Sequence, residues 1–192
     1  YFRHMPNMTV MMPKNGVELE KMLDFALNRM DSPVAIRYPR GEVSLRYSDN
    51  CNDIEYGKGE ILKDGEKIAV LSAGSMLDEA DDVCTLLEKD GYRPVLVNLR
   101  FAKPVDKELI KNVCEKCEYV FTIEDNVFEG GAGCAVLEAI NEEENIKNVA
   151  FHAFAFPDKF IEHGTRKELY ARYGLDGKTI YSEIKKRVEN NG

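Results

Sequence analysis

The sequence predicts an α/β protein with a mostly parallel sheet, one antiparallel edge strand and flanking helices. Several short apolar runs lack the alternation of a half-exposed strand and are typical of strands covered on both faces: Val34–Tyr38, Ile68–Leu71, Val95–Leu99, Tyr119–Glu124 and Val149–Phe154. Stretches with helical periodicity separate these runs. Asp64-Gly65, between strand candidates Glu60–Leu62 and Lys67–Leu71, is a strong type I′ hairpin signal. That hairpin would supply the antiparallel edge strand.

Residues 1–41 are expected to form one strand–helix–strand unit. Met8–Met12 is a short apolar run, and Asn15 is placed to cap a helix over residues 16–30. Val34–Tyr38 then predicts a second strand, parallel to the first. Such a unit is too small to fold alone, because its strands need neighbours on their edges and faces. We therefore interpret residues 1–41 as the end of a larger α/β domain, and the chain as a fragment.

A polar stretch, residues 42–53, has no convincing period and predicts a linker, so that residues 54–192 form the second domain. After the predicted hairpin, helices and strands alternate to the end of the chain. Helices are expected over Met76–Lys89 and Lys107–Cys117, from the glycine run at 130–133 to Glu143, and from near Thr165 and Asp176 onward. Capping residues precede three of these helices: Ser75 with Asp78, Asp106, and Thr165 with Glu168.

The composition excludes some classes of partner. The 192 residues are 44% hydrophobic and 31% charged, which is enough to bury a substantial core. The net charge of −8, from 34 acidic and 26 basic residues, argues against nucleic acid and anionic membranes, since both attract basic surfaces. No apolar run approaches the length of a membrane span. The five scattered cysteines suit a reducing compartment, so we expect a cytoplasmic protein.

Two arginines follow the apolar start of the segment Val34–Gly41. Arg37 and Arg40 lie near the carboxyl end of the predicted strand, where open parallel sheets bind their ligands. Pro39 cannot donate to a sheet ladder and Gly41 permits a turn, so together they would fix the direction of Arg40. A guanidinium group suits two oxygens of a phosphate or carboxylate. The motif alone leaves two interpretations open: phosphate binding, or an ion pair at a domain boundary.

Cys114 and Cys117 form a CxxC pattern, which occurs in redox and metal sites. They share one helical stripe with three apolar residues, so both thiols are expected to face the core: Leu109, Ile110 and Val113. A second cysteine pair at metal-ligand spacing is missing. We therefore favour a structural role for both cysteines.

The glycine run Gly130–Gly133 opens a predicted helix, whose free N–H groups could bind an anion. The run lacks both the lysine of a P-loop and the GxGxxG spacing of dinucleotide sites. The favoured interpretation is therefore close packing of the helix against the sheet or a partner subunit.

His163 precedes a predicted capped helix and could titrate near neutral pH. No general base or nucleophile lies near it in the sequence. A loop histidine at a domain boundary is therefore favoured over a catalytic role, and His4 and His152 carry weaker signals.

Five motifs occur together in this chain: Tyr1–Met8, Ala35–Gly41, Gly74, Glu124-Asp125 with Gly130–Gly133, and Pro157–Arg166. With them the sequence resembles the C-terminal part of 1-deoxy-D-xylulose-5-phosphate synthases, which are thiamine-diphosphate-dependent enzymes of the transketolase superfamily. The arginine strand and the Phe160–Gly164 run are specific to the synthases within this resemblance. The resemblance covers essentially the whole chain.

The resemblance implies that residues 1–41 finish a pyrimidine-binding domain and that residues 54–192 form a transketolase C-terminal-like domain. It implies a reaction that decarboxylates pyruvate and condenses the two-carbon unit with D-glyceraldehyde 3-phosphate, giving 1-deoxy-D-xylulose 5-phosphate for isoprenoid precursors. Arg40 matches the arginine that helps to hold the substrate phosphate in this family. Arg37 has no such support.

The implied cofactors of the complete enzyme are thiamine diphosphate and Mg²⁺. The family's Gly-Asp-Gly motif, its glutamate on the aminopyrimidine and its active-site histidines have no counterpart in these 192 residues. No residue here is therefore assigned a catalytic, cofactor or metal role, and the fragment alone is expected to be inactive.

The expected partners are the upstream part of the same enzyme and a second copy in a homodimer, because an incomplete domain exposes strand edges and apolar surface. Two alternatives stay open. A β-subunit of a 2-oxoacid dehydrogenase would pass its acyl group to a lipoyl arm and would not need a phosphate-directed Arg40. A non-catalytic binding module of the same fold is the other alternative.

Overall fold

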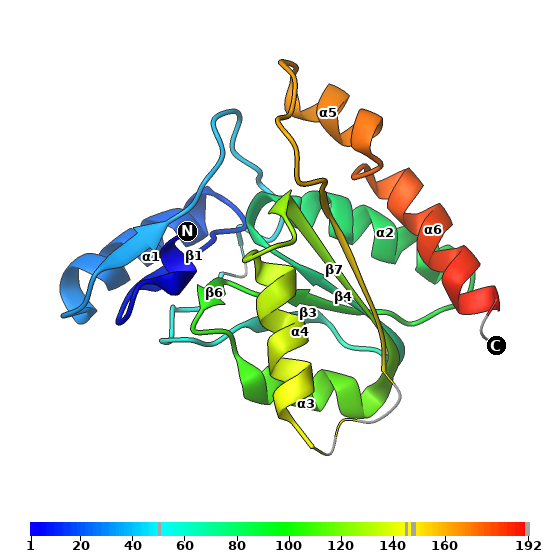
Figure 1. Cartoon of the computed structure of the whole chain (residues 1–192), viewed down its shortest axis with the longest axis horizontal. Helices are drawn as coiled ribbons and strands as arrows, with labels where there is room; N and C mark the ends of the chain where they lie inside the picture. Colours follow the sequence, from blue (N-terminus) through cyan, green and yellow to red (C-terminus); the bar gives the residue numbers. More distant parts are fainter. Residues whose placement is uncertain (50, 145, 147–148, 191–192) are drawn as a thin grey trace.

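The computed structural model describes residues 1–49, 51–144, 146 and 149–190, which form two sheets flanked by helices (Figure 1). The strands are β1 (Thr9–Met11), β2 (Val34–Ile36), β3 (Glu60–Lys63), β4 (Lys67–Ser72), β5 (Val95–Asn98), β6 (Phe101–Lys103), β7 (Cys117–Val127) and β8 (Ala150–Phe156). The helices are α1 (Gly16–Arg29), α2 (Leu77–Lys89), α3 (Lys107–Lys116), α4 (Ala132–Glu142), α5 (Arg166–Tyr173) and α6 (Gly177–Asn190), with short 3-10 turns η1 (Phe2–His4) and η2 (Gly74–Met76). The predicted α/β fold class is confirmed.

The larger sheet has the strand order β3-β5-β4-β7-β8, with β3 antiparallel to β5 and the other neighbours parallel. Alternate side chains of the central strand β4 enter two separate cores. Ile68 and Val70 join the core beneath α2 and α6, whereas Ala69 and Leu71 join the core that contains residues of α3 and α4. Burial on both faces explains why the strands of this sheet are continuous apolar runs.

The predicted hairpin is wrong, although the predicted antiparallel edge strand is present. β3 pairs with β5 and not with β4, its neighbour in the sequence. Gly65 is absent from the residues with positive φ, which a type I′ turn requires at both central positions. A Cβ on Gly65 would lie 2.0 Å from the carbonyl oxygen of Arg93. Glycine is therefore needed here because the chain passes closely over the segment that leads into β5.

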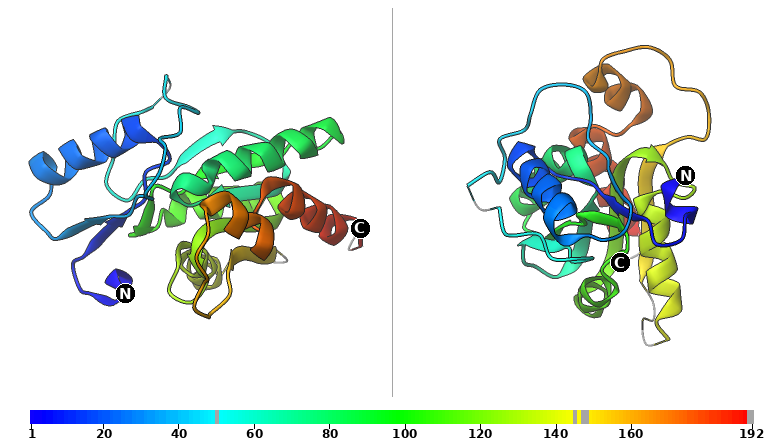
Figure 2. Two further views of the ribbon diagram at one scale, coloured as in Figure 1. Left: turned by 90° about the horizontal axis from the view of Figure 1, so that it is seen from above. Right: turned by 90° about the vertical axis from the view of Figure 1, so that its left-hand side faces the viewer.

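The smaller sheet has the order β2-β1-β6, with β1 parallel to β2 and antiparallel to β6. The strand β6 was not predicted, and it comes from the part of the chain that also builds the larger sheet. The small core of this sheet is likewise shared, because Phe101 and Ile54 pack with Met11, Met22 and Phe25. Figure 2 shows this unit at one end of the molecule, with α6 at the other end.

Most predicted helix caps are confirmed by backbone hydrogen bonds. Asn15, Asp106 and Thr165 accept from the amides of Glu18, Leu109 and Glu168, and Thr165 with Glu168 forms a complete capping box. The predicted cap of α2 is wrong, because the 3-10 turn η2 leads into the helix instead. Ser75 and Asp78 form hydrogen bonds with other segments of the chain.

The described helices also bear on the question of membrane insertion. None of them combines the length and the apolar character that crossing a bilayer requires. In the predicted linker at residues 42–53, the described residues 42–49 and 51–53 form no helix or strand, and Asn50 lies outside the described residues.

Candidate functional site

We call the five-stranded sheet with its helices the larger unit, and the three-stranded sheet with α1 the smaller unit. The segment that carries the two arginines leaves the carboxyl end of β2 in the smaller unit and crosses to α2 in the larger unit (Figure 1). We call residues 37–47 the strap. It is irregular throughout, and side chains near its two ends bind the larger unit. Arg40 lies between these two anchors.

The first anchor of the strap is an ion pair between Arg37 and Asp125, at the carboxyl end of β7. Arg37 donates from Nη1 to Asp125 Oδ1 at 2.5 Å and from Nη2 to the backbone oxygen of Asp125 at 2.8 Å. The other carboxylate oxygen, Oδ2, accepts from the hydroxyls of Ser75 and Tyr170 at 3.4 and 3.3 Å. Burial, together with the charge of Asp125, raises the pKa of Tyr170 to about 12. Arg37 therefore forms an ion pair, as one of the two open interpretations held.

The second anchor binds the far end of the strap to the first turns of α2. Ser44 donates to Asp78 at 2.8 Å, and Arg46 donates to Asp82 at 2.7 Å. The hydrogen bond to Asp82 and the charges of the nearby carboxylates raise the pKa of Arg46 despite partial burial. Three acidic residues of α2 thus hold this end: Asp78, Asp81 and Asp82.

Arg40 is exposed and makes no hydrogen bond or ion pair with any residue that the structure describes. Its neighbours constrain the backbone on both sides: Pro39 fixes its own φ, and Gly41 has a φ of 150° that residues with side chains rarely adopt. The predicted strand Val34–Tyr38 is shorter in the structure, because β2 ends at Ile36. Arg40 therefore lies within the strap, four residues beyond that end, with its guanidinium group available.

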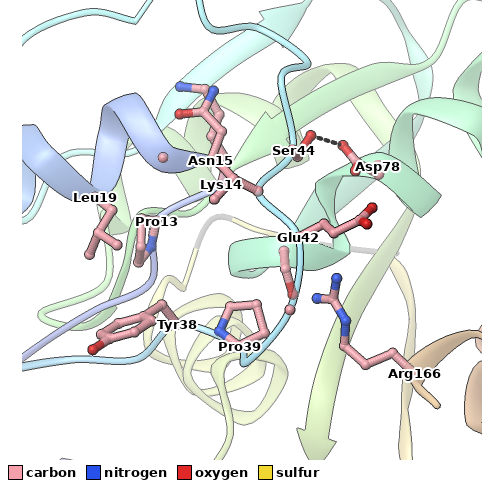
Figure 3. Close-up of a pocket in the computed structure, with 14 residues that line it drawn as sticks. Pro13, Lys14, Asn15, Leu19, Tyr38, Pro39, Glu42, Ser44, Asp78 and Arg166 are labelled. Carbon is pink, nitrogen blue, oxygen red and sulfur yellow. Dashed lines mark hydrogen bonds between the residues drawn. The ribbon is translucent and has the colours of Figure 1, made fainter.

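A pocket of about 280 Å³ lies beside Arg40, between the strap, the β1–α1 connection and the start of α5 (Figure 3). Pro39 and Gly41 line it, whereas Arg40 does not. Arg166, at the start of α5, extends its guanidinium group toward the strap in Figure 3. A Cβ on Gly41 would lie 3.7 Å from Nη2 of Arg166. Lining residues from opposite sides include Pro13, Lys14, Glu42, Ser75 and Asp78.

A cluster of four charged side chains, which we call the seam cluster, lies in the interior between the two units. Lys14 Nζ lies 2.9 Å from Glu18 and 2.7 Å from Glu60, and Arg100 pairs with the same two carboxylates at 2.8 and 3.2 Å. Asn98 adds hydrogen bonds to both oxygens of Glu18. The two positive and two negative charges balance, and all four side chains are buried.

The pKa of Glu18 shows how strongly the seam cluster holds this carboxylate. Burial would raise the pKa, but the charges of Lys14 and Arg100 and the backbone N–H of Lys14 outweigh burial and lower it from 4.5. The sequence did not predict the cluster. Lys14 and Glu18 have the spacing of a helical ion pair, but no local signal joins them to Glu60 and Arg100.

The glycine run binds an internal carboxylate. Glu124 on β7 accepts hydrogen bonds from the amides of Ala132 and Gly133, at 2.9 and 2.8 Å. A Cβ on Gly131 would lie 2.3 Å from a Glu124 oxygen. Burial raises the pKa of Glu124, and the two amide bonds partly oppose this rise. Glu124 thus fills the helix N-terminus, which supports the predicted close packing of helix on sheet.

The remaining sequence candidates lie apart from the strap. Cys117 begins β7, so the predicted single helical stripe with Cys114 is wrong, yet burial raises the pKa of these thiols to about 12 and 11. Such thiols are poor nucleophiles and poor metal ligands at neutral pH. His163 is exposed in the loop before α5. Within the described residues, no group of three or more His, Cys, Asp or Glu side chains could hold a metal ion.

Comparison with known families accounts for this two-unit arrangement. The family model of the transketolase C-terminal domain matches residues 57–180, and that of the transketolase pyrimidine-binding domain matches residues 1–45. The chain belongs to the transketolase family. The two matched domains correspond to the larger and smaller units of the structure.

Curated relatives of this transketolase-family chain include several proteins with closely similar names. Proteins named 1-deoxy-D-xylulose-5-phosphate synthase from Caldanaerobacter subterraneus and Clostridium tetani are 43% and 39% identical over 98% and 97% of the chain. A protein named 1-deoxy-D-xylulose-5-phosphate synthase 2, from Geobacter sulfurreducens, is 40% identical over 96%. These results confirm the resemblance inferred from the sequence. The chain spans about 30% of the length of these relatives.

Solved structures confirm the fold. A structure titled split gene transketolase, inactive beta4 tetramer, is 27% identical with a TM-score of 0.85, over 96% of this chain and 58% of that chain. A transketolase from Campylobacter jejuni has a TM-score of 0.72 at 22% identity, over 95% of this chain and 27% of that chain. The latter likeness concerns the fold alone.

Proposed function

We propose that this chain is the C-terminal part of a thiamine-diphosphate-dependent transferase of the 1-deoxy-D-xylulose-5-phosphate synthase type. The complete enzyme would combine pyruvate with D-glyceraldehyde 3-phosphate, releasing CO₂ and forming 1-deoxy-D-xylulose 5-phosphate. The name shared by relatives over nearly the whole chain supports this proposal. The proposed domains are residues 1–41 and 54–192, joined by residues 42–53.

The observation that carries the substrate assignment is the unpaired guanidinium group of Arg40. Its neighbour Arg37 is neutralised by Asp125, whereas Arg40 keeps its charge and its five N–H donors available. Arg40 also follows a strand at the carboxyl edge of a sheet and adjoins a pocket between the two units. In the proposal, Arg40 donates two parallel hydrogen bonds to the phosphate of D-glyceraldehyde 3-phosphate, which orients the acceptor aldehyde.

Thiamine diphosphate supplies the carbanion chemistry in this class of reaction, but the residues described here do not fit its binding. Among the described residues, no acidic cluster suits a metal ion, and the helix N-terminus at Gly131 already binds Glu124. We therefore assign no cofactor contact to this chain. In the proposal, thiamine diphosphate and Mg²⁺ bind to a segment upstream of Tyr1.

We further propose that the chain works only in association with that upstream segment and within a homodimer. The split-gene transketolase chain, 58% of which is covered by this chain, carries the word inactive in its title, which supports an inactive fragment here. Apolar side chains on α1 also remain open to solvent, including Leu23 at 46% and Leu27 at 82% exposure. Such surface is usually covered by a partner.

Enzyme reconstitution tests the proposed function. The chain is expressed as part of a complete enzyme, behind the upstream region that its relatives have, and is incubated with pyruvate, thiamine diphosphate and Mg²⁺. With D-glyceraldehyde 3-phosphate as acceptor, we expect stoichiometric CO₂ and 1-deoxy-D-xylulose 5-phosphate. The isolated chain is expected to give neither. Acyl transfer to a lipoyl domain, without condensation on the aldehyde, would instead assign the chain to a 2-oxoacid dehydrogenase.

A further inference from the structure

We propose that Asp125 is the positioning residue that fixes Arg40 for the acceptor phosphate. This inference rests on the proposed function, since it concerns how the substrate arginine is held. Asp125 lies on β7 in the larger unit, whereas Arg40 follows β2 in the smaller one. The connection between them is the Arg37–Asp125 ion pair, three residues before Arg40.

The contacts of Asp125 join three walls of the site. One carboxylate oxygen binds Arg37 of the strap, and the other accepts from Ser75, which lines the pocket, and from Tyr170 of α5. The side chain of Asp125 is only 10% exposed, so water competes weakly for these bonds. No other described residue joins the strap, η2 and α5 through one side chain.

The backbone alone leaves the end of the strand incompletely fixed. The amide of Arg37 donates to the carbonyl oxygen of Met11 at 2.9 Å, which holds it to β1 within its own unit. The next side-chain anchor is Ser44, which binds Asp78. An extended residue spans roughly 3.5 Å. If the first anchor were lost, the residues between Arg37 and Ser44 would therefore allow Arg40 to shift by several ångströms. Asp125 limits that movement relative to the pocket.

Asp125 also separates the two arginines by function. By pairing with Arg37, it removes a second cation that would compete for the phosphate from a wrong position. Arg40 then remains the unpaired guanidinium group of the strap. An error of about 1 Å in the placement of a substrate-holding group is enough to slow a reaction substantially.

The test uses Asp125→Asn, Arg37→Gln and their double variant in the complete enzyme, with steady-state kinetics on two acceptors. We expect each single variant to raise KM for D-glyceraldehyde 3-phosphate roughly five- to twentyfold with little change in kcat. The double variant is expected to match the single ones, because both remove the same contact. With unphosphorylated D-glyceraldehyde, the penalty is expected to fall below about twofold. Asp125→Glu is expected to recover most of the wild-type KM.

Asp90→Asn is the matched control, because it removes a carboxylate paired with Lys185 between α2 and α6, away from the strap. Its kinetics are expected to equal those of the wild type. Hydrogen exchange in the complete enzyme gives a second readout, independent of activity. The amides of Tyr38 and of residues 40–43 are expected to exchange faster in Asp125→Asn than in Asp90→Asn.

The outcomes separate this inference from the proposed function. If Arg40→Ala raises KM for the phosphorylated acceptor but Asp125→Asn does not, the positioning role is overturned and the function stands. An equal penalty with both acceptors would reduce Asp125 to a structural ion pair and overturn the inference. If exchange accelerates in Asp125→Asn while Arg40→Ala leaves KM unchanged, the anchor exists, but both the role of Arg40 and this inference are wrong.

Discussion

The seam cluster and the strap both join the smaller unit to the larger one, and they do so in opposite environments. In the seam cluster, the side chains of Lys14, Glu18, Glu60 and Arg100 are between 0% and 7% exposed. In the strap, Arg37 and Arg46 are 45% and 41% exposed, and Arg40 has no partner among the described residues. The same chemical groups therefore serve two purposes.

The difference shows how burial determines what an ion pair does. Buried charges lose their hydration, so each needs its partner, and removal of one leaves the others uncompensated. Half-exposed pairs are screened by water and contribute little to stability, but they still set geometry. We infer that the seam cluster fixes how the two units pack, whereas the strap presents Arg40 to a ligand.

The largest expected effect is on the stability of the seam cluster. Glu18→Ala removes the carboxylate that both Lys14 and Arg100 use, and leaves two buried cations with one counter-charge. We expect a loss of about 3–5 kcal/mol in the free energy of unfolding, measured by urea denaturation. A loss below about 1 kcal/mol would contradict this expectation and would show that the seam cluster contributes no more to stability than ordinary surface ion pairs do.

A smaller effect on the free energy of unfolding is expected when the pH is lowered. Because the pKa of Glu18 is lowered in the folded state, Glu18 binds a proton more readily when unfolded. Its contribution to stability is therefore full above pH 4.5 and is lost as the pH falls through the folded pKa. The difference in unfolding free energy between wild type and Glu18→Gln is expected to be constant at neutral pH and to shrink below pH 4.5. A difference that grows toward acid pH would contradict this sign.

The smallest effect is expected at the second anchor of the strap. Arg46→Ala removes contacts with three carboxylates of α2, but the side chain is 41% exposed and well screened. We expect the free energy of unfolding to fall by less than about 1 kcal/mol, in the same denaturation experiment. A loss as large as that of Glu18→Ala would remove the distinction between strap and seam cluster.

Local signals in the sequence predicted most of the elements. The caps at Asn15, Asp106 and Thr165 depend on residues three positions apart, so they can be recognised from the sequence alone. Arg40 was predicted to lie near the end of a strand because Pro39 and Gly41 follow an apolar run, and β2 ends at Ile36, two residues earlier than the predicted end at Tyr38. The role of Arg40 as a phosphate ligand stays a prediction.

Local signals could not predict contacts between residues that are distant in the sequence. Asp64-Gly65 has the composition of a hairpin turn, but β3 forms its hydrogen bonds with β5, about 35 residues further along the chain. The strand β6 is a short run after Arg100, and only its contact with β1 makes it a strand. Likewise, the carboxylates of Glu18 and Glu60 meet Arg100 only once both sheets have formed.

The selectivity of the complete enzyme between phosphorylated and unphosphorylated acceptors tests the central claim most directly. Wild type and Arg40→Ala are compared by kcat/KM for D-glyceraldehyde 3-phosphate and for D-glyceraldehyde. A charge-assisted contact contributes about 1.5–3 kcal/mol, so we expect Arg40→Ala to reduce the ratio of the two values roughly ten- to a hundredfold. Arg40→Lys is expected to retain part of the ratio, since lysine keeps the positive charge but lacks the two parallel N–H donors of a guanidinium group. An unchanged ratio in Arg40→Ala would contradict the assignment of Arg40 to the phosphate.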